Sequence, residues 1–226
     1  MAEVIELSDF VAEATEWIAS RVVAKQADGF SAFRLSLCGG STPRSIYAAL
    51  AERKDIDWTR VLLTFGDERC VPPDHADSNY RMVKESLLDP GEVPSASVMR
   101  MAGEMDPEEA AARYDGQLKK LAQLAGEERF VHDLVLLGMG DDGHTASLFP
   151  ETTALEEMER NAVANFVPKF DSWRLTLTYP LINAAKEVAF LVNGEKKRPI
   201  VNEVLAGGSP YPAEQVKASK VTWLLG

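Results

Sequence analysis

The segment that most constrains the fold of this chain is the apolar run Leu134-Val135-Leu136-Leu137, which stands between Asp133 and Gly138. A strand with no polar position has no face for solvent, so other parts of the protein must cover both of its faces, as they do for central strands of parallel sheets. Parallel strands need long crossover connections, which are usually helices. The run therefore predicts an α/β fold.

Strand and helix patterns alternate along the rest of the chain, as an α/β fold requires. Strands are predicted at 33–38, 61–65, 162–166, 174–178, 188–192 and 221–224, and helices at 10–22, 43–53, 78–88, 107–124 and 197–206. This alternation predicts a doubly wound, mostly parallel sheet. The stretches 89–97 and 207–213, rich in Pro, Gly and Ser, are predicted to be loops, so residues 1–226 are expected to form a single α/β domain.

The net charge excludes several classes of partner. The 24 Lys and Arg against 35 Asp and Glu give −11, so neither nucleic acid nor an anionic membrane surface is expected as a partner. No apolar run approaches the roughly 18 residues of a membrane span, and the N-terminus is acidic where a secretory signal is basic. Cys38 and Cys70 are too few for a disulfide framework. We expect a cytoplasmic protein, monomeric or a small homo-oligomer, that binds a small molecule.

Three loops that follow predicted strands combine glycines with chemically active side chains. The first is Gly39-Gly40-Ser41-Thr42-Pro43. Its glycines permit close approach of a ligand, and its hydroxyls lie at the start of a helix, where free N–H groups favour phosphate. A plain tight turn with a Ser or Thr cap is the alternative. Cys38, just before it, is predicted to be a buried thiol at a strand end rather than a nucleophile.

The second loop, Gly66-Asp67-Glu68-Arg69, follows the predicted strand at 61–65. Its carboxylates can orient a polyol, and its guanidinium can bind phosphate or carboxylate through two parallel hydrogen bonds. A surface salt-bridge cluster is the alternative for three neighbouring charges. Asn79, near the predicted start of the next helix, is expected beside the same cleft.

The third loop runs from Gly138 to Pro150 and reads GMGDDGHTASLFP. Its glycines have the GxGxxG spacing of a dinucleotide site, but Pro150 would cut short the helix that such a site needs, and no acid follows a second strand about 20 residues later. His144 is instead predicted to be a general base near neutral pH, with Asp142 to fix its tautomer. The other two histidines, His75 and His132, are predicted to be structural or exposed.

Two further cations lie at the ends of predicted elements. Arg174 begins the strand at 174–178, and Lys197 follows the strand at 188–192. A solvated surface charge is the usual state of a single Lys or Arg. An anion site in this acidic chain needs cations at such positions, so both residues are candidates to bind the anion.

Taken together and in this order, GGSTP, GDER, GMGDDGHTASLFP, RLTLTYPLINAA and NGEKK resemble the 6-phosphogluconolactonase family, within a larger group that includes glucosamine-6-phosphate isomerases. The resemblance spans nearly the whole chain. It implies a fold like that of the glucosamine-6-phosphate isomerase and ribose-5-phosphate isomerase group. The implied activity is hydrolysis of 6-phosphogluconolactone in the pentose phosphate pathway, a reaction whose chemistry requires neither a metal nor a redox cofactor.

The resemblance also implies roles for individual residues. It places phosphate binding on Gly39, Gly40, Ser41, Thr42, Arg174 and Lys197. Arg69 is expected to face the substrate and His144 to be the catalytic base, with either Asp142 or Asp67 to orient the imidazole or the sugar hydroxyls. Lys196 is an alternative to Lys197, although the spacing from Gly194 favours Lys197.

Two other functions are weighed against the lactonase. The sister isomerases continue their glycine–histidine motif into Phe-Asn-Glu-Pro, whose Glu assists ring opening, whereas this chain has Ser147-Leu148-Phe149-Pro150. This difference favours the lactonase over a glucosamine-6-phosphate isomerase and deaminase. The other alternative is a catalytically silent sugar-phosphate sensor, for which the sequence offers no additional partner-binding module.

Overall fold

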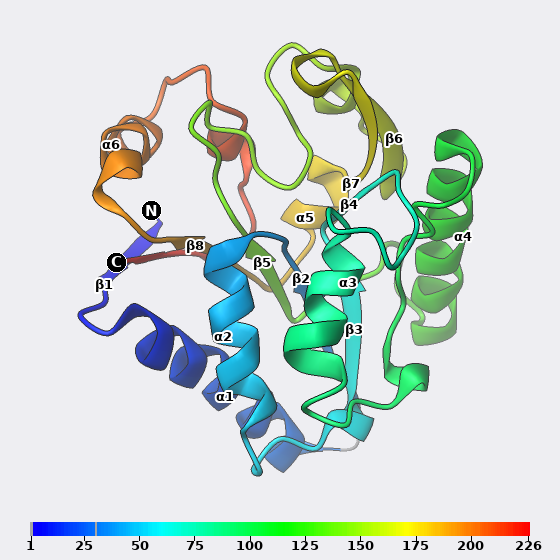
Figure 1. Ribbon diagram of the computed structural model, residues 1–226, viewed down its shortest axis with the longest axis vertical. Helices are drawn as coiled ribbons and strands as arrows, with labels where there is room; N and C mark the ends of the chain where they lie inside the picture. The colour runs from blue at the N-terminus through cyan, green and yellow to red at the C-terminus, as the bar shows by residue number, and fades with distance from the viewer. Residues whose placement is uncertain (1, 30) are drawn as a thin grey trace.

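The computed structural model describes residues 2–29 and 31–226, and its centre is a six-stranded parallel sheet (Figure 1). Its strands lie in the order β1 (Glu3–Glu6), β9 (Val221–Leu225), β8 (Glu187–Val192), β5 (Leu134–Leu137), β2 (Phe33–Leu37) and β3 (Val61–Phe65). The apolar strand β5 is buried along its whole length inside this sheet. The predicted α/β fold with a mostly parallel sheet is confirmed.

Side-chain caps mark the starts of three of the described helices. The helices are α1 (Phe10–Asp28), α2 (Ser41–Ala51), α3 (Asn79–Val83) with the π-helical turn η2 (Lys84–Leu88), α4 (Pro107–Ala125), α5 (Tyr179–Asn183) and α6 (Arg198–Ala206). Asp9, Ser78 and Asp106 accept N–H groups at the starts of α1, α3 and α4, which defines those boundaries. No helix within residues 2–29 and 31–226 combines the length and the apolar character needed to span a membrane.

A second, antiparallel sheet is the main departure from the predicted arrangement. It contains β4 (Asp67–Arg69), β7 (Ser172–Leu177) and β6 (Ala162–Val167) in that order. The last two coincide with predicted strands, but the turn of 168–171 between them is too short for a parallel crossover, so they pair with each other instead of joining the large sheet. Residues 67–69, predicted as a loop, pair with β7. Strand β1 was not predicted, because its four residues give too short a pattern.

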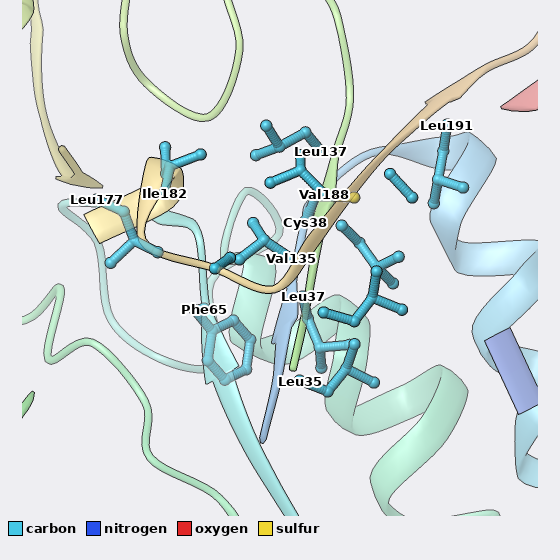
Figure 2. Packing of buried hydrophobic residues seen from close by; sticks show 14 of the residues in the cluster. Leu35, Leu37, Cys38, Phe65, Val135, Leu137, Leu177, Ile182, Val188 and Leu191 are labelled. Atoms are coloured by element: carbon cyan, nitrogen blue, oxygen red, sulfur yellow. The ribbon is translucent and has the colours of Figure 1, made fainter. Parts of the chain in front are cut away.

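The hydrophobic core lies between the large sheet and the helices that cover it. Figure 2 shows Leu35 and Leu37 of β2 packed beside Val135 and Leu137 of β5, and all four are fully buried. Cys38 ends this row and is buried as predicted, and burial raises the pKa of its thiol to about 12. A thiol with that pKa is protonated at neutral pH and is not a nucleophile.

The strand order creates a switch point between β2 and β5. From β2 the chain continues to β3 on one side, whereas from β5 it continues to β8 on the other. The connections that leave these neighbouring strands therefore part, and a crevice opens at their carboxyl ends, the usual ligand site of such sheets. The segments that follow β2 and β5 are the loops of Gly39 and of His144.

His132, which lies just before β5, is fully buried and makes stability depend on pH. Its Nε2 lies 2.9 Å from Thr64 Oγ1, and within the described residues its buried Nδ1 has no partner. Burial, helped by the Arg34 cation, lowers its pKa from 6.5 to about 3. Between pH 6.5 and 3, His132 therefore binds a proton in the unfolded chain but stays neutral in the folded protein. The free energy of unfolding falls as the pH falls through this range.

We expect His132→Gln to remove this pH dependence. Between pH 6.5 and 5 the histidine costs the wild type about 2 kcal/mol of unfolding free energy, at about 1.4 kcal/mol per pH unit. Urea unfolding at several pH values measures how the free energy of unfolding changes with pH. The control is His75→Gln, a change at an exposed histidine, which should show the same pH dependence as the wild type. Equal slopes for His132→Gln and the wild type would contradict the assignment.

Candidate active site

A cleft of about 280 Å³ opens at the switch point. It is lined by the loop after β2, by β4, by the loop after β5 and by the start of the segment that leads into α6. Its lining residues include Gly39, Gly40, Ser41, Thr42, Asp67, Arg69, Gly140, His144 and Lys197. A larger groove of about 500 Å³ lies beside α6, but most of its lining residues are apolar and none is a histidine. The cleft is therefore the candidate active site.

The loop after β2 lines the cleft and leads into the first turn of α2. Gly40 has a φ of 114°, a conformation that favours glycine, and is the N-cap of α2. Helix α2 begins at Ser41, two residues earlier than predicted, so Ser41 and Thr42 belong to its first turn. N–H groups in a first turn have no partner inside the helix and attract anions.

Gly39 is required by the packing of the same loop. A Cβ at this position would overlap the side chain of Asn79, which is buried and is tied to Asp67 by hydrogen bonds from its Nδ2. We expect Gly39→Ala to lower the unfolding free energy by about 1–3 kcal/mol in urea unfolding. Gly116→Ala, where a Cβ meets open space on α4, is the control and should gain about 0.5–1 kcal/mol. A fully stable Gly39→Ala variant would disprove the packing argument.

His144 is held by Asp142 and by an aromatic ring. Its Nδ1 lies 2.5 Å from Asp142 Oδ1, and its imidazole stacks on Phe149 with centroids 3.9 Å apart. Burial tends to raise the pKa of Asp142, but hydrogen bonds from Lys169 and His144 outweigh it and bring this pKa down to about 2. With Nδ1 directed to a carboxylate, Nε2 is the nitrogen that is available for proton transfer.

Asp67 has different partners. Its Oδ2 accepts a hydrogen bond of 2.7 Å from Ser147 Oγ, and its Oδ1 accepts one from Asn79 Nδ2 at 3.1 Å. These bonds connect β4 to the loop after β5 and to the start of α3. Of the two acids considered for the imidazole, Asp142 is the one that contacts it, whereas Asp67 lines the cleft.

Arg69 and Arg174 lie side by side on the antiparallel sheet. They are cross-strand partners in the register of β4 and β7. Among the carboxylates of the described chain, none forms an ion pair with either, and Arg174 Nε is buried without a partner. Burial, and then the Arg69 charge, lower the pKa of Arg174. Two adjacent guanidiniums that form no ion pair with a described carboxylate are an arrangement suited to an anion.

Lys197 reaches the cleft from the opposite side. It ends the short turn η6 (Glu195–Lys197), and its Nζ donates a 2.6 Å hydrogen bond to the Met139 carbonyl. Lys197 lines the cleft, as Arg69 does, whereas Lys196 and Arg174 are not among the lining residues. Across residues 2–29 and 31–226, no three His, Cys, Asp or Glu side chains are grouped to hold a metal ion.

Two residues support the site in roles that the sequence did not predict: Glu68, expected among the carboxylates that orient a polyol, and Lys169. Glu68 is buried, and its carboxylate accepts N–H groups of Asn79 and Tyr80, each at 2.7 Å, so it positions the start of α3. Lys169, whose Nζ lies 2.8 Å from Asp142 Oδ2, comes from the turn between β6 and β7. A single lysine in a turn offers no signal in the sequence.

The fold and the cleft together define an α/β protein with an Asp–His pair beside a glycine loop that leads into a helix N-terminus. A family model described as "Glucosamine-6-phosphate isomerases/6-phosphogluconolactonase" matches residues 6–223. The chain belongs to this family, and the resemblance seen in the sequence motifs is confirmed.

Individual relatives agree with this membership. The chain is 39% identical over 212 residues to the 6-phosphogluconolactonase of Synechocystis sp., covering 91% of this chain and 85% of that protein. It is 37% identical over 217 residues to the human 6-phosphogluconolactonase, covering 92% and 83%. The crystal structure of 6-phosphogluconolactonase from Thermotoga maritima superposes with a TM-score of 0.87 at 28% identity, over 100% of both chains.

Proposed function

We propose that this chain hydrolyses 6-phosphogluconolactone to 6-phosphogluconate in the pentose phosphate pathway. The observation that carries the proposal is the position of His144, bonded to Asp142, in a cleft that also contains Arg69 and Lys197. A base and an anion site within one small cleft suit a phosphorylated substrate whose reaction needs only an activated water. The names of the relatives support the same substrate.

His144 is the general base in the proposed mechanism. Its Nε2 takes a proton from water as the water oxygen bonds to the lactone carbonyl carbon, and the carbonyl oxygen becomes an oxyanion. Backbone N–H groups of the glycine loops are the donors for this oxyanion. The intermediate collapses with cleavage of the bond between the carbonyl carbon and the ring oxygen. His144 returns the proton to the departing ring oxygen, which becomes a hydroxyl group.

The phosphate is bound away from the reacting carbon. The first turn of α2, with Ser41 and Thr42, and the cations Arg69, Arg174 and Lys197 are its proposed partners. A substrate anchored at the phosphate has its lactone carbon placed near His144 without further ordering, which lowers the entropic part of the barrier. The excess acidic charge of the chain does not oppose this site, because a local group of cations decides the potential inside a small cleft.

Ser147 argues against the isomerase alternative. The isomerases use an acid in the segment after their glycine–histidine motif, and this chain has Ser147 to Pro150 there. The Ser147 hydroxyl donates to Asp67 and is buried, so it supports the cleft instead of supplying an acid. The segment therefore favours hydrolysis over ring opening.

One assay tests the proposal. Freshly generated 6-phosphogluconolactone is added to the protein, and acid release is followed in a pH-stat or product formation by coupling to a dehydrogenase. We expect hydrolysis well above the spontaneous rate, and activity that survives EDTA. Ammonia release from glucosamine 6-phosphate would favour the isomerase. Binding of 6-phosphogluconate without turnover of the lactone would favour the sensor.

A further inference from the structure

The turn between β6 and β7 contacts the His144 loop through two consecutive residues. Lys169 Nζ donates to Asp142 Oδ2, on the carboxylate whose other oxygen bonds His144 Nδ1. Phe170 packs edge-on against Phe149, with ring centroids 5.6 Å apart, and Phe149 stacks on the imidazole. The turn thus contacts His144 indirectly, through Asp142 at the edge of the imidazole and through Phe149 at its face.

We infer that Lys169 is a positioning residue for His144, because it holds the Asp142 carboxylate in the orientation that receives the imidazole Nδ1. The inference rests on the proposed function, since it concerns the base of that reaction. In this proposal Lys169 does not contact the substrate. It affects the reaction only through Asp142.

The local structure explains why Asp142 needs a second partner. Asp142 lies in a loop between Gly140 and Gly143, and its side chain is 26% exposed, so packing alone does not fix its torsions. The hydrogen bond from His144 involves only one carboxylate oxygen, so without Lys169 the other would be bound by water alone. Lys169 donates a hydrogen bond to this second oxygen, and its ammonium lies 5.6 Å from the centroid of the Phe170 ring. Because Lys169 is about half exposed, the pair adds little to stability, and its effect falls on geometry.

Lys169 also affects the charge that His144 experiences. The charged groups around the imidazole are Asp142 in its own loop, Lys169 from the β6–β7 turn, Asp67 and Arg69 from β4, Lys197 from η6, and Arg174, whose guanidinium lies over Phe170. Lys169 shares the carboxylate that would stabilise an imidazolium. Its removal therefore favours protonation of His144 at a higher pH than in the wild type.

The test compares Lys169→Met with Lys169→Arg and with a matched control. Lys119→Met removes a similar surface pair, because Lys119 Nζ lies 2.7 Å from Asp115 on α4, outside the cleft lining. The first measurement is an NMR titration of the histidine ring protons in the free protein, which has only three histidines to assign. The second is the pH profile of kcat, with KM, for lactone hydrolysis.

We expect Lys169→Met to move the His144 titration and the acidic limb of kcat to higher pH. It should lower kcat about tenfold, as loss of such supporting contacts commonly does, and leave KM within about twofold. Lys169→Arg should recover most of the activity, and Lys119→Met should change nothing. An unchanged His144 titration overturns the inference, and so does a raised KM with an unchanged kcat, which would make Lys169 a substrate-binding residue. If the wild type shows no lactonase activity, the proposed function fails, while the titration still tests Lys169.

Discussion

His144→Ala is expected to lower kcat for 6-phosphogluconolactone by about a thousandfold, within the range of 10²–10⁴ typical of general base catalysis. The imidazole is the proposed acceptor of the water proton and is already oriented by Asp142. Removing it leaves the cations and backbone donors of the cleft in place. KM should therefore change little, because the proposed phosphate contacts are intact.

The measurement must subtract the spontaneous hydrolysis of this labile lactone, so initial rates are taken over a range of enzyme concentrations. His75→Gln is the matched control: His75 is exposed and outside the cleft lining, and glutamine keeps an acceptor for the Asp77 N–H that His75 Nδ1 receives. Full activity of His144→Ala above the spontaneous rate would refute the mechanism. A large loss of activity in His75→Gln would show that the assay does not specifically measure the contribution of the catalytic base.

Arg174→Ala is expected to raise KM about 10- to 100-fold while kcat falls much less, since a hydrogen bond to a charged group is worth about 1.5–3 kcal/mol. Arg174 lies beside Arg69 in the β4–β7 register, with a buried Nε that has no partner in the described chain. A phosphate would neutralise this pair of like charges. Uniform binding of substrate and transition state affects KM and not kcat.

A substrate without phosphate separates this role from a general loss of structure. Glucono-δ-lactone has the reacting group but lacks the anion, so Arg174→Ala and the wild type should hydrolyse it at similar, low efficiency. Arg160→Ala, which removes a half-exposed arginine paired with Glu157, is the control and should leave the hydrolysis of both lactones unchanged. An equal loss of kcat/KM on both lactones would show that Arg174 supports the fold of the cleft and does not bind the phosphate.

The central parts of the fold and the site were predictable from short segments. The burial of β5 follows from four consecutive apolar residues. Gly138 marks the end of β5 directly, and Gly39 marks the end of β2 one residue later, after Cys38. The choice of His144 over the other histidines rested on its glycine-rich loop, and the structure places it in the cleft while His132 is buried elsewhere. These features depend on neighbours in the sequence.

The antiparallel sheet was not predictable in the same way. A strand pattern at 162–166 or 174–178 shows that a segment is extended, but not which strand it pairs with. Residues 67–69 are too few and too charged to give a strand pattern, and they become a strand because β7 offers them hydrogen bonds. This pairing is what brings Arg69 next to Arg174.

The sequence by itself determined the class of fold, the loops that hold the chemistry, and the absence of the isomerase acid after His144, because each is written in residues that are adjacent along the chain. Only the tertiary structure decided that the loops after β2 and β5 share one cleft, that Asp142 rather than Asp67 bonds the imidazole, and that Lys169 reaches Asp142 from a separate turn. These contacts join residues that are distant in sequence, such as Asp67 and Ser147, which are 80 positions apart. They depend on strand order and packing, which the periodicity of side chains does not encode.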